Sequence, residues 1–266
     1  MLKIGIIGAS GYTGLELIRL LLGHPEVEIT TITSEKYAGQ KISEIFPSLK
    51  GWTELSYKKL DPDDIGAYCQ LVFMALPHLS SMPLVPILRK KRLRIIDLSA
   101  DFRLKDPQTF VQWYNCSHAC PKLLDEAVYG LSEIHRPAIK GAHITANPGC
   151  YPTGIILALA PLLRENLIAD KFVLIDSKSG ISGAGRKADL EYQFCESHEA
   201  LRVYQPVMHR HIPEIEQELS YLAGEEFRVS FTPHLVSMNR GILNTIYVKL
   251  MIEPSLQNLL EIYQDF

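Results

Sequence analysis

One cysteine of this 266-residue chain stands where a thiol could act as a nucleophile. Cys150 follows the turn Asn147-Pro148-Gly149 and precedes an apolar stretch, 151–163, with the composition of a helix. Pro152 suits the first turn of that helix, because its nitrogen has no hydrogen to leave unpaired. The positive end of the helix dipole would favour the thiolate, and nearby amides could stabilise an oxyanion. We therefore expect Cys150 to attack an acyl carbon, although most cysteines are only small buried residues.

A glycine-rich turn near the start of the chain predicts a dinucleotide site. It joins an apolar run, 2–7, to residues 14–23, in which leucine and isoleucine recur at helical spacing. Glycines there let the backbone approach a pyrophosphate, which binds amides at the helix N-terminus. Any tight corner between strand and helix can also contain glycine, and the spacing differs from the commoner G-x-G-x-x-G. The cofactor contacts expected in this turn are Gly8, Ser10, Gly11, Tyr12, Thr13 and Gly14.

The residues after a second apolar run, 27–33, should meet the adenosine ribose of the cofactor. Ser34 and Lys36 could bind the 2′-phosphate of NADP, whereas Glu35 would repel that phosphate if it pointed inwards. The residues alone leave the choice between NADP and NAD open. His78 follows another apolar run, in the position of a cofactor loop.

A thiolate near a nicotinamide suggests a thioester that accepts a hydride and becomes an aldehyde. This chemistry needs an acid or base, which is normally histidine. His209 and His211 flank Arg210. On a strand they would point in opposite directions, and on a helix they would lie about 200° apart, so only one should face the thiol.

The segment 177–187 combines glycines and serines with Arg186 and Lys187. Such a segment can form an amide nest with a cationic wall for phosphate. Its alternative interpretation is a flexible surface loop. Beside an acylated thiol and a cofactor turn, a phosphate leaving group is the simpler explanation.

The composition excludes several other classes of protein. A net charge of −3 gives no sign of a nucleic-acid or membrane-surface partner. No apolar run approaches the ~20 residues that span a bilayer, and the first residues lack a signal-peptide pattern. The five cysteines are scattered, and only Cys116 and Cys120 have a spacing that suggests a metal ligand pair. We expect a reduced, cytoplasmic protein without a metal site.

The pattern of elements predicts an α/β fold with two parts. In the first part, strand, helix and strand follow within about 30 residues, as in a βαβ unit. Continuous apolar runs there are typical of buried parallel strands. The runs are 71–76 and 94–98, with a helix expected over 79–91. We predict a Rossmann-like dinucleotide-binding domain with a mostly parallel sheet over residues 1–147.

The second part, residues 148–266, should be an α+β catalytic domain. Its helix, 151–163, is followed by several strand-like runs, of which the last alternates like a half-covered antiparallel strand. These runs are 172–176, 227–232 and 242–250.

Taken in order, the motifs resemble those of the N-acetyl-γ-glutamyl-phosphate reductases along essentially the whole chain. Besides the segments already described, the likeness rests on Ala75 to His78, Ile96 to Arg103, His209 to Gln217 and Asn239 to Gly241. The resemblance implies NADP(H) as cofactor, N-acetylglutamyl phosphate as substrate and a role in arginine biosynthesis. It also implies Cys150 as nucleophile and a histidine of the His-Arg-His run as acid or base. By analogy with the related aspartate-semialdehyde dehydrogenases, we choose His209.

The resemblance further implies a catalytic and dimerisation domain of the semialdehyde dehydrogenase type and a homo-oligomer, either a tetramer or a dimer. Further cofactor contacts are then expected at Pro77, His78, Ser179 and Gly180. Substrate contacts are expected at Asn147, Ser182, Gly183, Arg186 and His211. Ser237 replaces the usual proline of the family. Because family members continue beyond Phe266, we expect a member that is incomplete at the C-terminus.

Three other functions compete with this interpretation. A sister reductase, acting on aspartate semialdehyde or on a carrier-linked aminoadipate, would share the chemistry. A truncated chain could instead be a catalytically silent nucleotide-binding module. A cysteine hydrolase is the third, but it leaves the glycine turn unexplained.

Overall fold

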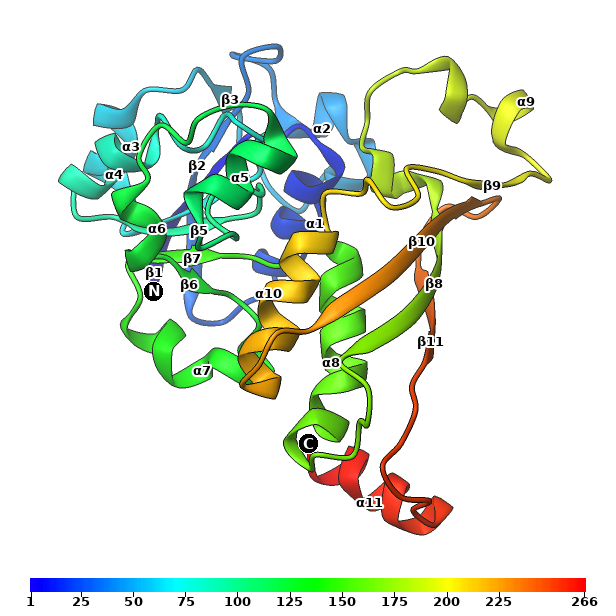
Figure 1. Ribbon diagram of the computed structural model, residues 1–266. Helices are drawn as coiled ribbons and strands as arrows, with labels where there is room; N and C mark the ends of the chain where they lie inside the picture. Colours follow the sequence, from blue (N-terminus) through cyan, green and yellow to red (C-terminus); the bar gives the residue numbers. More distant parts are fainter. The chain divides into compact units, whose positions relative to one another are not determined.

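The computed structural model describes all 266 residues. The chain divides into two compact units, Met1–Pro148 and Gly149–Phe266, each of which is described by itself (Figure 1). Among the helices, none has the length and apolarity that a membrane span requires.

The first unit contains a seven-stranded sheet in the order β3-β2-β1-β4-β5-β7-β6, with every pair of neighbours parallel. The strands are β1 (Leu2–Ile7), β2 (Val27–Thr33), β3 (Tyr57–Lys58), β4 (Leu71–Met74), β5 (Arg94–Asp97), β6 (Val128–Tyr129) and β7 (Ile144–Ala146). The chain builds outwards from β1 to β3 and then returns to the other side of β1 with β4. Open α/β sheets bind ligands at the carboxyl ends of the strands where the order reverses in this way.

Seven α-helices connect these strands. They are α1 (Tyr12–Leu21), α2 (Ile42–Ile45), α3 (Pro62–Tyr68), α4 (Val85–Lys90), α5 (Pro107–Tyr114), α6 (Lys122–Glu126) and α7 (Ser132–Gly141), with a 3₁₀ turn at Pro47–Leu49. The starts of α3 and α5 follow from local sequence. Asp61 and Asp106 each accept amide hydrogen bonds from the first turn, and a proline occupies its first position.

The second unit contains a mixed four-stranded sheet in the order β11-β8-β10-β9. Its strands are β8 (Phe172–Gly180), β9 (Leu201–Val203), β10 (Arg228–Val236) and β11 (Ile242–Tyr247). The central pair, β8 and β10, is parallel, and both outer strands are antiparallel to their neighbours. The helices are α8 (Cys150–Arg164), α9 (Phe194–Ser197), α10 (Ile212–Ala223) and α11 (Leu256–Asp265), with 3₁₀ turns at Ile181–Ala184 and Leu190–Tyr192.

Only one face of the four-stranded sheet is covered. Along β8, Val173 and Ile175 are buried, whereas Phe172 and Leu174 are about half exposed. Helices α8 and α10 pack against each other and against strands of this sheet (Figure 1). The alternation follows from the strand period of two, which sends successive side chains to opposite faces.

The predicted fold class is confirmed, with differences at several elements. The helix expected over 79–91 is limited to Val85–Lys90. Leu79 has a left-handed φ of 70°, and Pro83 and Pro86 have no amide hydrogen for a helical bond. The segment after Asp101 showed no clear period, yet it contains α5. An eight-residue helix has little more than two turns, so its apolar face gives a weak periodic signal, and its cap at Asp106 is the better indication.

Two substitutions in α1 test how this unit is packed. Ile18 is fully buried and Leu20 is 60% exposed. We expect Ile18→Ala to lower the free energy of unfolding by about 2–5 kcal/mol, because it leaves a cavity against the sheet. Leu20→Ala should change it by less than about 0.5 kcal/mol. Urea denaturation measures both, and equal losses would show that α1 packs differently.

Candidate active site

The glycine turn has the geometry of a dinucleotide-binding corner. Gly8 has a φ of 81°, and a Cβ on it would lie 2.4 Å from the carbonyl oxygen of Ala75 in the segment after β4. A Cβ on Gly14 would lie 2.6 Å from the Cα of Ala9, so α1 packs tightly onto the turn. Gly11 is the N-cap of α1 and has open space around it. Tight turn, open approach and close helix packing are the three requirements of a pyrophosphate site.

The residues after β2 contact this turn. The hydroxyls of Ser10 and Ser34 lie 2.9 Å apart, and the Gly8 amide donates to Thr33 Oγ1 at 3.3 Å. Glu35 accepts a hydrogen bond from the Leu60 amide at 3.0 Å.

The carboxylate of Glu35 is therefore held by another backbone segment. Lys36 is exposed, with its Nζ 5.1 Å from the centre of the Tyr37 ring. Hydroxyls and an ammonium group at this point suit a cofactor with an additional phosphate on its ribose.

Two other predicted cofactor contacts lie in the loop after β4. Pro77 and His78 are exposed, as are Tyr12 and Thr13 in the first turn of α1. The Ala100 amide donates to His78 Nδ1 at 3.1 Å. An uncharged His78 ring therefore has its proton on Nε2, where it can donate a hydrogen bond to a ligand.

In the second unit, Cys150 is the first residue of α8 and its side chain is exposed. The Gly149 amide before it donates to Glu214 Oε1 at 2.7 Å. Glu214 is only 1% exposed and lies in the first turn of α10. The Gly149 carbonyl oxygen accepts from both the amide and the hydroxyl of Thr153. One buried carboxylate thus fixes the N-termini of α8 and α10 next to each other.

The two candidate histidines lie at the N-terminal end of α10. His209 is 9% exposed, and its ring centre is 4.7 Å from that of His211 and 5.5 Å from that of Tyr151, the residue after Cys150. The His211 amide donates to His209 Nδ1 at 3.2 Å, so an uncharged His209 ring has its proton on Nε2. Burial, with a smaller effect from Arg210, lowers the pKa of His209 to about 4. The His209 ring is therefore neutral at pH 7.

A pair of tyrosines extends this cluster. The hydroxyls of Tyr151 and Tyr204 lie 2.7 Å apart, and Tyr204 also packs edge-on against His209. Burial raises the pKa of both tyrosines, and the charge of Cys150 adds to the effect. Both hydroxyls stay protonated, and the Cys150 sulfur is within electrostatic reach of them.

The predicted phosphate nest differs from expectation. The amides of Gly180, Ile181 and Ser182 donate to carbonyl oxygens of the turn 238–241 at 2.9–3.0 Å. Gly180 is required there, since a Cβ would lie 2.8 Å from the Arg240 nitrogen. These three amides are occupied and cannot bind phosphate.

The groups left for a ligand on this segment are side chains and the residues after Ser182. Ser179 is buried, and its hydroxyl donates to the Gly180 carbonyl. Gly183 and Arg186 are exposed.

Asn147 lies in the first unit, at the end of β7. Its side-chain amide donates to the Pro148 carbonyl at 3.1 Å, and its own carbonyl accepts from Arg103 Nε at 2.8 Å. The buried Arg103 also donates to the Leu98 carbonyl, so it links the segments after β5 and β7.

Several polar residues in these clusters were not predicted as site residues. Glu214 could have been found, because it is an acid between Pro213 and Ile215 at the apolar start of a helix. Asp101 and Arg103 each stand between two apolar residues, which is a similar signal. Tyr204 gave no signal, since one tyrosine in a loop is ordinary.

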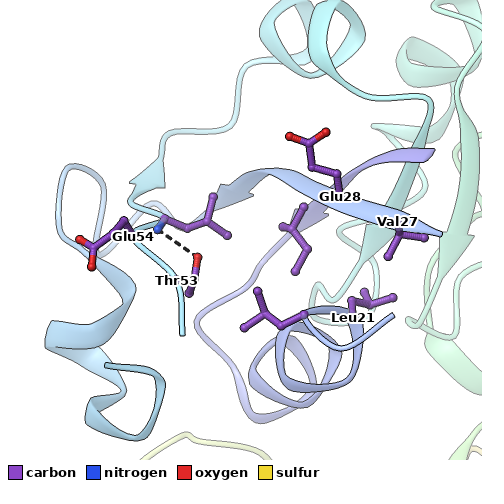
Figure 2. A pocket seen from close by; sticks show the side chains of 8 residues that line it. Leu21, Val27, Glu28, Thr53 and Glu54 are labelled. Atoms are coloured by element: carbon purple, nitrogen blue, oxygen red, sulfur yellow. Dashed lines mark hydrogen bonds between the residues drawn. The ribbon is translucent and has the colours of Figure 1, made fainter. Parts of the chain in front are cut away.

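A shallow pocket of about 380 Å³ lies elsewhere in the first unit, at the beginning of β2 (Figure 2). Residues that line it include Leu21, Val27, Glu28, Thr53 and Glu54. None of the predicted site residues lines this pocket.

Two family models match the chain. Residues 3–142 match "Semialdehyde dehydrogenase, NAD binding domain", and residues 150–266 match "Semialdehyde dehydrogenase, dimerisation domain". Among solved structures, the chain resembles aspartate semialdehyde dehydrogenase II from Vibrio cholerae (TM-score 0.73, 13% identity, 98% of this chain and 78% of that one). It also resembles aspartate semialdehyde dehydrogenase with NADP from Candida albicans (TM-score 0.72, 15% identity, 100% and 76%). At these identities the likeness concerns the fold.

Curated relatives are much closer in sequence. The N-acetyl-gamma-glutamyl-phosphate reductases of Acetivibrio thermocellus and Geotalea daltonii are each 51% identical to this chain. Each match covers 100% of this chain and 77% of the relative. The chain belongs to the N-acetyl-gamma-glutamyl-phosphate reductase family.

Proposed function

We propose that this protein reduces N-acetyl-L-glutamyl 5-phosphate to N-acetyl-L-glutamate 5-semialdehyde and phosphate, with NADPH as reductant, in arginine biosynthesis. The observation that supports it best is Cys150, an exposed thiol at the first position of α8, whose neighbour Tyr151 packs against the buried His209. A dinucleotide corner in the same chain supplies the second requirement. Acyl transfer to a thiol followed by hydride reduction needs both.

The first unit fits NADP. Gly8 and Gly14 leave no room for a Cβ, and Gly11 leaves the backbone open at the N-terminus of α1. Ser34 and Lys36 would hold the 2′-phosphate. We assign cofactor binding to residues 1–147 and catalysis to residues 148–266. When bound, NADPH supplies the hydride that reduces the thioester carbon.

The protein's own part of the reaction begins at Cys150. Its thiolate forms a C–S bond with the γ-acyl carbon, and the C–O bond to phosphate breaks. After reduction the C–S bond breaks, the semialdehyde leaves, and the sulfur takes up a proton. The dipole of α8 stabilises the thiolate at the start of this cycle.

His209 is our choice for the acid and base. Its neutral ring offers Nε2–H as a hydrogen-bond donor to the oxyanion that develops on the acyl group. The negative charge of a thiolate or acyl phosphate nearby would raise the low pKa of the ring. To take the thiol proton at Nε2, the ring must change tautomer and give up the hydrogen bond from the His211 amide to Nδ1. It returns the proton when the sulfur leaves.

The substrate side of the site is a further proposal. Arg186 is an exposed cation on the segment that begins with Ser182 and Gly183, and its guanidinium suits phosphate. His211 lies beside His209 and would contact a polar group of the substrate. Asn147, proposed for the substrate, and Ser179 and Gly180, proposed for the cofactor, are held by backbone contacts and would act through the shape of the backbone.

A homo-oligomer, a dimer or tetramer, is the expected assembly. The outer face of the four-stranded sheet presents Leu174 and Tyr247 as a cross-strand pair, with Phe172 and Leu243 along the same strands. All four side chains are 49–63% exposed. A sheet face that exposes these side chains beside the Asp176–Lys178 ion pair suits a second copy of the chain. The cytosol is the proposed compartment, because the reaction needs a reduced thiol and no cysteine here forms a disulfide.

Replacing the Cys150 sulfur tests the mechanism. We expect Cys150→Ser to lower semialdehyde formation by more than about 10³-fold, since an alcohol is a far weaker nucleophile. Cys195→Ser is the matched control, because Cys195 is the other exposed cysteine, and its activity should match the wild type. The assay follows NADP reduction with N-acetylglutamate semialdehyde and phosphate. A Cys150→Ser enzyme with near wild-type rate would exclude the thioester.

Removing the positive charge of Lys36, which follows β2, tests whether the cofactor is NADPH. Lys36→Gln should raise the KM for NADPH about tenfold and leave that for NADH nearly unchanged, because only NADPH has the 2′-phosphate. Lys50→Gln, at an exposed lysine of the same unit, should change neither value. Equal effects of Lys36→Gln on both cofactors would contradict the assignment.

Burial of His209 predicts a dependence of stability on pH. Its pKa is about 4 in the folded protein against 6.5 in an unfolded chain, so the folded state binds this proton more weakly. The contribution to stability is complete above pH 6.5 and is lost as the pH falls towards 4, by about 3 kcal/mol.

His209→Asn should remove this loss, whereas His143→Asn, at an exposed histidine, should keep it. Urea denaturation at pH 4.5 and 7 measures the difference between variants, which cancels the other titrating groups. A His209→Asn protein with the wild-type pH slope would show that the ring is not buried as described.

A further inference from the structure

The loop after β4 borders the dinucleotide corner. A Cβ on Gly8 would lie 2.4 Å from the Ala75 carbonyl oxygen and 3.1 Å from the Leu76 side chain. Strands β1 and β4 are neighbours, and the order of the sheet reverses between them. The position of this loop, Ala75 to Met82, therefore decides what a bound dinucleotide meets on that side.

One carboxylate binds the backbone of the loop. Asp101 is fully buried, and its two oxygens accept amide hydrogen bonds from Leu79 at 2.6 Å, Ser81 at 2.9 Å and Met82 at 3.0 Å. Leu79 has a φ of 70°, a conformation that leucine rarely adopts without an external constraint. The bond to Asp101 provides that constraint.

Asp101 is itself held in place from both sides. Its amide donates to Ser99 Oγ at 3.1 Å, and its carbonyl lies 2.8 Å from Nε2 of the buried His118. The Cys120 amide donates to His118 Nδ1, so Nε2 must be the donor to the Asp101 carbonyl. The Asp101 backbone is therefore held by groups outside the loop.

A second buried carboxylate in the same network has different partners. Asp97 accepts from the Ser81 hydroxyl at 2.8 Å and from the hydroxyl and amide of Ser99 at 2.7 and 3.1 Å. Hydroxyls can rotate and accept instead of donate, whereas backbone amides cannot. Both oxygens of Asp101 accept from backbone amides, whereas Oδ2 of Asp97 accepts only from the Ser99 hydroxyl. The two aspartates therefore form a matched pair in which only Asp101 requires an ionised carboxylate.

We propose, on the basis of the function proposed above, that Asp101 is a positioning residue for the cofactor. Its carboxylate fixes the loop Ala75 to Met82 beside the glycine turn, so that Pro77 and His78 meet the bound dinucleotide in one orientation. The Ala100 amide, adjacent to Asp101, orients the His78 ring through Nδ1. Residues Ala100 and Asp101, after β5, thus set the position of the loop and the orientation of the His78 ring.

The test compares Asp101→Asn with Asp97→Asn in the full chain. NADPH affinity is measured by fluorescence titration, and protection of the Leu79, Ser81 and Met82 amides by hydrogen exchange. The asparagine side chain in Asp101→Asn can accept with one oxygen only, which leaves amides unpaired. We expect Asp101→Asn to weaken NADPH binding at least tenfold, which corresponds to about 1.4 kcal/mol, and to lose the protection. Asp97→Asn should change the affinity less than about threefold and retain the protection.

The rate of Cys150 alkylation by iodoacetamide without cofactor serves as the readout of the second unit and should be unchanged in both variants. Wild-type NADPH affinity in a folded Asp101→Asn protein would overturn the inference while the proposed function stands. Equal losses for both aspartates, or a changed alkylation rate, would assign Asp101 a general structural role and also overturn it. Should Asp101→Asn not fold, Asp101→Glu keeps the charge but displaces the oxygens and must weaken NADPH binding. A wild-type protein that fails to bind NADPH would refute both proposals.

Discussion

The hydrogen bond from the Gly149 amide to Glu214 is the contact on which the catalytic unit depends. It joins the N-terminus of α8, with Cys150, to the first turn of α10, which His209 and His211 directly precede. Burying a carboxylate destabilises the folded state unless the carboxylate is hydrogen-bonded. Glu214 can therefore be buried only with partners such as the Gly149 amide. The same bond removes one amide from the turn that precedes the thiol. Any oxyanion must therefore be stabilised by other donors, of which the His209 Nε2–H is the one that we favour.

In both units a buried carboxylate accepts hydrogen bonds from backbone amides and so fixes the backbone of a proposed site. Glu214 does so at the proposed nucleophile, and Asp101 does so at the proposed cofactor loop. A carboxylate can accept several amide hydrogen bonds at once, and charge makes each bond stronger. These residues fix backbone that would otherwise be a mobile loop or a frayed helix end. Reactive side chains such as Cys150 and exposed ones such as His78 can then stay accessible without being poorly placed.

The sequence predicted the fold class well, because its signals were local. Glycine spacing after a buried strand marks a dinucleotide corner, and the apolar run after Cys150 marks α8. The motifs also identified the family, which the relatives at 51% identity confirm. The contacts within each site could not be predicted in the same way. Glu214 binds Gly149 from 65 residues away, and the turn 238–241 occupies the amides of Gly180 to Ser182. Both contacts depend on tertiary packing, which no local pattern encodes.

The half-exposed face of the four-stranded sheet has a thermodynamic consequence. Side chains such as Leu174 and Tyr247 remain in contact with water in an isolated chain. If two copies associate through this face, binding acts only on folded protein and shifts the unfolding equilibrium by mass action. The melting temperature would then increase with protein concentration. For such a chain, stability is a property of the solution as much as of the single molecule.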